Sequence, residues 1–114
     1  MGNPRPTRAL SVRQPFAEQI IDGTKRFEYR DIRTNIRERV YVYASKTPAD
    51  SSIWRKSGFE TGSLPTGVIV GTVEIAACEE RKYGYAWRLK NPLRAKRKMR
   101  PRNQPQPVWF KPFG

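Results

Sequence analysis

Histidine is absent from this sequence of 114 residues, and cysteine occurs only once. The absence of histidine removes the side chain that most often acts as a general base at neutral pH, and it removes the commonest metal ligand. The single cysteine, Cys78, cannot form an internal disulfide bond, which is typical of proteins in the reducing cytoplasm. These shortages favour a cytoplasmic protein with no metal and no cofactor, and they argue against most enzymes.

Long apolar runs are also missing. No run approaches the roughly 18 residues that a membrane-spanning helix requires. The first eight residues have no apolar stretch behind their charged residues, as a signal peptide would have. The length suits one domain with one core. We therefore expect a flexible, proline-containing arm over residues 1–7, a single domain over residues 8–114, and a monomer that does not associate with membranes.

Acidic residues are absent from the last part of the chain. Residues 81–114 contain 11 Lys and Arg residues and no Asp or Glu, whereas residues 1–80 contain 12 Lys and Arg residues and all 10 acidic residues. A surface with this much positive charge is tolerated most easily when a polyanion neutralises it, and nucleic acid is the usual polyanion. The alternatives are a basic surface that serves only solubility, or one that binds acidic membranes. The tail has no amphipathic helical pattern, which argues against membranes.

The apolar pattern predicts six short strands and two short helices. The first helix begins at Pro15 and ends before Gly23, and the second has Thr47 as its N-cap and ends near Gly58. Strands are predicted over residues 7–13, 25–30, 39–45, 67–77, 85–89 and 107–110. Gly71, inside the strongest strand, predicts a bulge or a bend. Because strands and helices do not alternate regularly, we expect a small, closed or nearly closed mixed β-barrel.

The segment around Lys25 combines charge with strand alternation. Phe27 and Tyr29 are predicted to face the core, while Glu28 and Arg30 lie side by side on the other face. Lys25 stands where the helix gives way to the strand. Two cations and a carboxylate can hold a phosphate and accept a hydrogen bond from a base or a ribose. The structural alternative is a cation near a helix end and an ordinary surface ion pair.

Two segments around this site resemble the ASCH domain family. They are residues 10–16 (LSVRQPF) and residues 20–30 (IIDGTKRFEYR), which contain the motif G-x-K-x-x-E-x-R, and the resemblance extends over residues 9–113. It implies a PUA-like β-barrel of the α+β, mainly β class. It also implies binding of single-stranded RNA, in preference to DNA, or of a modified nucleotide in a cleft lined by the motif.

Other ASCH proteins resemble ribonucleases, or amidohydrolases that act on acylated cytidine-type nucleosides through a Lys–Thr–Glu set. In that branch the threonine stands three residues after the lysine, where this chain has Glu28. The catalytic candidates are therefore Lys25, Glu28 and Glu74, and the missing hydroxyl argues against this activity. A third alternative is a protein-interaction module in transcription or translation regulation.

The predicted nucleic-acid-binding residues fall into a cleft group and a basic group. The side chain of Gln14 is expected to read a base edge, and Trp54 to stack on a base. Trp87 and Trp109 are expected in the core. The basic group lies in a segment that is expected to be extended, over residues 91–107, and it is expected to follow the phosphate backbone without base specificity. The structural alternative is a solvated loop. The full set is Gln14, Lys25, Glu28, Arg30, Ser45, Lys46, Trp54, Arg94, Lys96, Arg97, Lys98 and Arg100.

Overall fold

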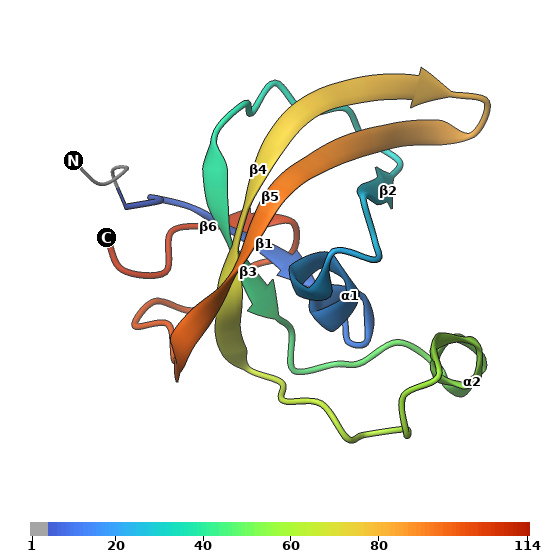
Figure 1. Cartoon of the computed structure of the whole chain (residues 1–114). Helices are drawn as coiled ribbons and strands as arrows, with labels where there is room; N and C mark the ends of the chain where they lie inside the picture. Colours follow the sequence, from blue (N-terminus) through green and yellow to red (C-terminus); the bar gives the residue numbers. More distant parts are fainter. Residues whose placement is uncertain (1–4) are drawn as a thin grey trace.

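One mixed sheet of six strands and two short helices make up the fold (Figure 1). The structure is a computed structural model that describes residues 5–114. Residues 1–4 of the expected N-terminal arm lie outside the described residues. The elements in chain order are β1 (Ala9–Val12), α1 (Phe16–Asp22), β2 (Phe27–Arg30), β3 (Arg39–Ala44), α2 (Ser51–Ser57), β4 (Val68–Arg81), β5 (Gly84–Met99) and β6 (Trp109–Phe110).

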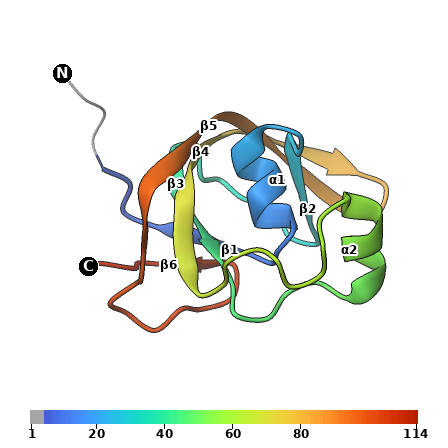
Figure 2. The same ribbon diagram turned by 60° about the horizontal axis from the view of Figure 1, so that its bottom comes forward.

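The sheet is curled but open. Its strand order is β2-β5-β4-β3-β1-β6, and β1 and β3 are its parallel pair. The long β4–β5 hairpin curves over α1, which packs inside the curl against β3, β4 and β5 (Figure 2). No strand pairing within residues 5–114 joins β2 to β6, so a closed barrel is not confirmed. A side-chain hydrogen bond links β2 to β1 across part of the open side of the sheet, because Arg30 Nη2 donates to the Ser11 carbonyl at 2.8 Å.

The ends of the helices follow local capping rules. Helix α1 stops at Gly23, whose φ of 88° is readily reached only by glycine, as expected. Helix α2 likewise ends at Gly58, but the expected N-cap at Thr47 is wrong. Asp50 is the N-cap, because its carboxylate accepts the Ile53 N–H, and Asp caps at least as well as Thr. Neither helix reaches the length and apolar character that crossing a membrane requires within the described part of the chain.

Strand β5 is much longer than the expected 85–89. It continues to Met99, so most of the extended basic segment is part of this strand. Pro92 is tolerated there because β2 pairs only with residues 85–88, which leaves the rest of β5 at an edge. Gly71 lies at the expected bulge, where an added Cβ would strike the Leu93 carbonyl oxygen and Ile21 Cδ1.

The core lies on the concave side of the sheet, beneath α1. Its central members are aliphatic residues of β1, β3, β4 and α1, together with the fully buried Trp87. Trp109 stacks on Trp87 with ring centroids 5.7 Å apart, so both occupy the expected core positions. Cys78 is partly buried against this core.

The expected orientation of β2 is wrong. Tyr29 is 64% exposed and Phe27 is only half-buried, whereas Glu28 is buried. Glu28 lies directly opposite Trp87 in the β2–β5 ladder, so the inner face of β2 is the charged one. The strand alternates as expected, but its aromatic residues occupy the outer face.

Candidate nucleic-acid cleft

A cleft of about 540 Å³ opens between β1, β2, the end of β3 and the C-terminal loop. This volume is within the range of small-molecule sites. The predicted residues that line it are Glu28, Arg30, Ser45 and Lys46. Tyr43 also lines it. The lining residues that sequence reasoning missed are Ser11, Arg13, Phe16, Thr47, Gln104, Pro105, Gln106, Pro107 and Val108.

The inner wall of the cleft is a buried ion pair. Glu28 Oε2 accepts from Arg30 Nε at 2.8 Å and lies 2.7 Å from Arg30 Nη2. The guanidinium also stacks over Trp87, with 5.7 Å between Cζ and the ring centroid. These contacts fix the plane of the guanidinium. Among residues 5–114 its Nη1 has no hydrogen-bond partner, so it can donate to a ligand.

Lys25 approaches the same carboxylate from outside the cleft. Its Nζ lies 3.5 Å from Glu28 Oε1 and does not line the cleft. The ammonium group also lies 4.9 Å from the Phe16 ring centroid and 5.1 Å from that of Tyr29. Glu28 therefore joins two cations, with Arg30 facing the cleft and Lys25 behind it. Two of the three expected motif residues meet in the cleft.

Two cations at the cleft mouth have no carboxylate partner. Arg13 and Lys46 are exposed, and neither takes part in an ion pair within residues 5–114. Glu28 is the only acidic residue in the lining, and Arg30 already neutralises it. The mouth of the cleft is therefore positively charged, which suits an anionic ligand.

The C-terminal loop forms one wall of the cleft. Ser11 N donates to the Val108 carbonyl at 2.9 Å, and Ser11 Oγ donates to the Gln106 carbonyl at 2.7 Å. The β1–β6 pairing continues this attachment. Tyr43 also lines the cleft, and burial raises the pKa of its hydroxyl, which is therefore neutral at neutral pH.

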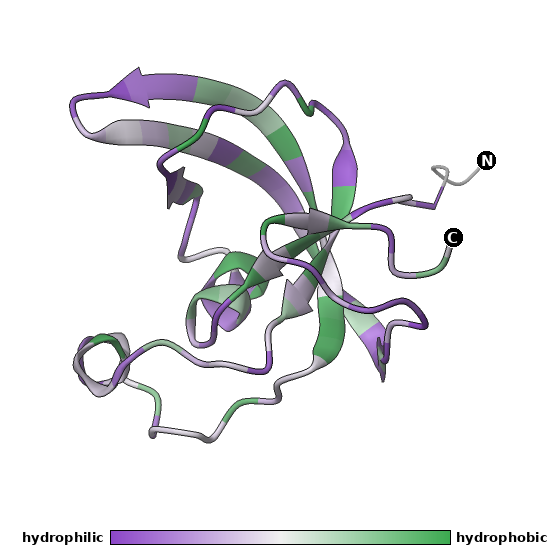
Figure 3. Cartoon of the chain, turned by 180° about the vertical axis from the view of Figure 1, so that it is seen from behind, coloured by the Kyte–Doolittle hydropathy of each residue, from purple (hydrophilic) through white to green (hydrophobic). Residues whose placement is uncertain are grey.

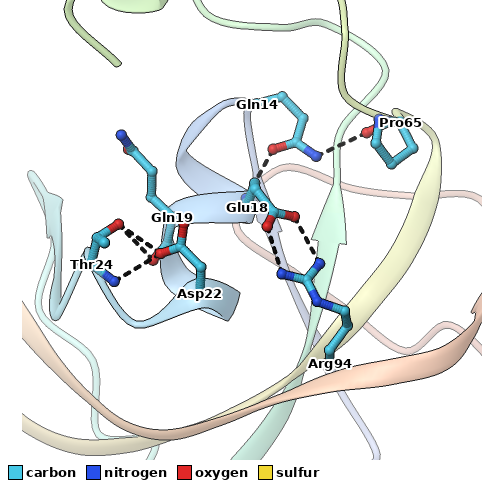
Figure 4. A network of polar contacts seen from close by, with 7 residues as sticks. All are labelled: Gln14, Glu18, Gln19, Asp22, Thr24, Pro65 and Arg94. Atoms are coloured by element: carbon cyan, nitrogen blue, oxygen red, sulfur yellow. Dashed lines mark hydrogen bonds and ion pairs between the residues drawn. The ribbon is translucent and has the colours of Figure 1, made fainter. Parts of the chain in front are cut away.

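Gln14 and Trp54 do not reach the cleft. Gln14 is fully buried, and its amide accepts from Glu18 N and donates to the Pro65 carbonyl, both at 2.9 Å (Figure 4). It thus satisfies a free N–H in the first turn of α1. Trp54 is 1% exposed, and its Nε1 donates to the Ala49 carbonyl at 3.1 Å. The expected base contacts of both residues are therefore wrong.

Glu74 lies away from the other two catalytic candidates. Its carboxylate pairs with Arg39 at 3.3 Å and accepts from Asn91 at 3.2 Å. It lines a different hollow, beside Arg37 and Glu38. Residues 5–114 contain no group of three or more His, Cys, Asp or Glu side chains that is placed to hold a metal ion.

The basic segment lies on the outer part of β5 and beyond it, not in the cleft lining. Arg94 forms a two-pronged pair with Glu18 at 2.6 and 2.9 Å, and this hydrogen bonding raises the pKa of Arg94 (Figure 4). Arg94 is therefore partly neutralised. The other four predicted members are exposed and have no ion pair within the described residues: Lys96, Arg97, Lys98 and Arg100.

A curled mixed sheet that wraps one helix, with a basic-mouthed cleft between β1 and β2, defines a small α+β domain. Residues 10–107 match the ASCH domain family, which is most of the chain, and the protein belongs to that family. No curated protein matches the chain.

Proposed function

We propose that this ASCH domain binds single-stranded RNA, or a plain or modified nucleotide, in the cleft lined by Glu28 and Arg30. The observation that supports this most directly is the charge arrangement of the cleft. A buried carboxylate is held by an arginine whose Nη1 is open, and two cations without an ion-pair partner among residues 5–114 stand at the mouth. Such a site offers one acceptor deep inside and several donors near the entrance.

The division of the cleft matches the two halves of a nucleotide. Arg13 and Lys46 at the mouth suit a phosphate group. Phe16 and Val108 supply apolar surface for the flat face of a base. The Glu28 carboxylate can accept a hydrogen bond from an exocyclic amino group, while Arg30 Nη1 donates to a ring nitrogen or carbonyl.

The depth of the site favours an unpaired nucleotide. Glu28 is only 7% exposed, so a base must enter the cleft to reach it. A base inside an A-form duplex is stacked and paired and cannot do this without being extruded. Single-stranded RNA meets the requirement without that cost.

The test compares two double variants that remove the same charge. Arg13→Gln with Lys46→Gln changes the cleft mouth, while Arg55→Gln with Lys56→Gln changes exposed residues of α2. Affinity for a labelled single-stranded RNA is measured by fluorescence anisotropy. We expect the cleft pair to weaken binding about 10- to 100-fold, which corresponds to a combined loss of about 1.4–2.8 kcal/mol from the two exposed cations. The α2 pair should change binding by less than about threefold. Equal losses in the two variants would show that only overall charge matters and would refute the cleft.

The geometry supports hydrolysis less well than binding. Glu74 is engaged by Arg39 and lines another hollow, and Lys25 lies behind Glu28, outside the cleft lining. The Tyr43 hydroxyl, with its raised pKa, is a poorer nucleophile. Incubating the same RNA with the protein provides the check. Strand cleavage that is abolished in Lys25→Met but retained in Lys90→Met would favour a ribonuclease instead.

A further inference from the structure

Aromatic side chains form a stripe on the outside of the molecule, from α1 across β2 to the turn of the β4–β5 hairpin. The stripe consists of Phe16, Phe27, Tyr29 and Tyr83. Tyr29 is 64% exposed and Tyr83 is 87% exposed, while Phe16 and Phe27 are half-buried. The Phe27 and Tyr29 rings are nearly parallel, at an interplanar angle of 24° with centroids 6.3 Å apart. Exposed aromatic groups in such a cluster indicate a binding surface.

Cations lie against every ring of the stripe. Lys25 Nζ contacts the faces of Phe16 and Tyr29. Arg81 Cζ lies 5.9 Å from the centroid of Phe27, and Lys82 Nζ lies 5.3 Å from that of Tyr83. Figure 3 shows hydrophilic colouring at the Arg81 end of β4, to which Glu79 and Glu80 also contribute. Aromatic rings that alternate with positive charges provide stacking for bases and attraction for phosphates.

Acidic residues neutralise part of this charge. Glu79 pairs with Arg81 at 2.9 Å, Glu28 lies 3.5 Å from Lys25, and Asp31 lines the hollow beside Tyr83. Arg26 and Lys82 form no ion pair within residues 5–114 and leave positive charge along the same face. A second copy of this chain is a poor occupant, since each copy has a net charge of +13 and would repel the other.

The stripe is continuous with the cleft. Phe16 lines both the cleft and a hollow of about 460 Å³ that also contains Lys25 and Tyr29. Tyr29 in turn borders a hollow of about 430 Å³ that contains Tyr83, and Arg30 is shared between that hollow and the cleft. A chain that leaves the cleft past Phe16 or Arg30 therefore meets the aromatic stripe next.

From this continuity we infer that the stripe stacks bases of single-stranded RNA that extend beyond the nucleotide in the cleft. The natural ligand is then an oligonucleotide and not a free nucleotide. This inference rests on the proposed function of the cleft, and it adds a second contact region that the motif does not include. Each stacked base contributes affinity that a mononucleotide cannot gain.

The test compares two ligands across matched variants. The ligands are a single-stranded RNA of about eight nucleotides, which is within the usual range of stacking sites, and the ribonucleoside 5′-monophosphates tested one at a time. Tyr29→Ala and Tyr83→Ala remove stripe rings. Tyr29→Phe keeps the ring, and Phe113→Ala removes a partly exposed aromatic ring outside the stripe. Melting temperatures confirm that each variant is folded.

We expect each Tyr→Ala change to weaken octamer binding about 5- to 150-fold, which corresponds to the loss of one stacked base. Mononucleotide affinity should stay within about twofold of wild type, and Tyr29→Phe and Phe113→Ala should bind the octamer normally. Normal octamer binding by both Tyr→Ala variants, with binding abolished in Arg13→Gln/Lys46→Gln, would overturn the stripe and keep the cleft. The opposite pattern, with octamer binding dependent on the tyrosines alone, would overturn the cleft. If Tyr29→Ala weakened the binding of the octamer and of the mononucleotides by the same factor, the stripe would also be overturned. Tyr29 would then affect the nucleotide in the cleft through Lys25, and would not stack a further base.

Discussion

Replacing Glu28 with glutamine tests whether the charged cluster of Lys25, Glu28 and Arg30 holds the fold together. The glutamine keeps the size of the side chain but removes the charge that both cations share. The Glu28 side chain is 9% exposed, and those of Lys25 and Arg30 are 15% and 20% exposed. All three groups have therefore given up most of their hydration, and the cations would be left without a counter-charge.

The expected cost follows from these contacts. Removing one partner of a fully buried ion pair typically costs about 3–5 kcal/mol, and hydrogen bonds to charged groups contribute about 1.5–3 kcal/mol. Because Lys25 and Arg30 keep some contact with water, we take the lower part of this range, about 2–4 kcal/mol. For a domain of this length, 1 kcal/mol corresponds to about 4 °C in melting temperature, so the expected decrease is about 8–16 °C.

The cluster also predicts an order among variants. Lys25→Met should cost about 1 kcal/mol or less, because the Lys25–Glu28 separation of 3.5 Å is long and Glu28 keeps Arg30. Thermal and urea unfolding of both variants give the stabilities. Glu60→Gln, at an exposed site with no ion pair among the described residues, controls for the change in net charge. A Glu28→Gln variant as stable as Glu60→Gln, or a Lys25→Met variant that loses equal stability, would refute this account.

Three further changes test other parts of the structure. Replacing the exposed basic residues Lys96, Arg97, Lys98 and Arg100 with glutamine should reduce the slope of the logarithm of the RNA-binding constant against the logarithm of the salt concentration. The expected reduction is about 0.7 for each phosphate that is no longer neutralised. An unchanged slope would exclude these residues as phosphate ligands. Gly71→Ala should abolish soluble expression or cost several kcal/mol, because its Cβ would strike the Leu93 carbonyl, whereas Gly114→Ala should have no effect on the melting temperature. Asp50→Ala should lower the melting temperature at neutral pH. Hydrogen bonds from Ser52 and Ile53 lower the pKa of Asp50. The carboxylate therefore stabilises the fold at pH values above the usual Asp range, and this stabilisation disappears as the pH falls through the lowered pKa. A difference in melting temperature between Asp50→Ala and wild type that persists in strong acid would contradict this.

Much of the fold could be predicted because local chemistry determines it. Gly23 and Gly58 end the helices at positive φ, where other residues are strained. The length of β5 was missed, since Pro92 and a run of basic residues are typical of loops. They are tolerated in a strand only because β2 is short and leaves that part of β5 at an edge. That condition depends on strand order, which no local pattern contains.

The candidate site was predicted in part for a similar reason. Glu28 and Arg30 are two residues apart on a strand, so their proximity follows from the backbone alone. The wall formed by residues 104–108 depends on the β1–β6 pairing and on bonds from Ser11 across more than 90 residues of chain. Gln14 was misassigned because a buried amide that bonds to the backbone has the same sequence signal as one that binds a ligand.

The inverted orientation of β2 links the two proposals. Burying a large aromatic side chain usually stabilises a fold by about 1.5–3 kcal/mol, yet Tyr29 is left in water while charged groups occupy the inner face. A strand selected for stability alone would have the opposite orientation, and departures from such local rules are expected at functional sites. With this orientation, the inner face of β2 supplies the cleft with Glu28 and Arg30, and the outer face supplies the stripe with Phe27 and Tyr29. One short strand can therefore contact two successive parts of the same RNA, the nucleotide in the cleft and the bases that follow it.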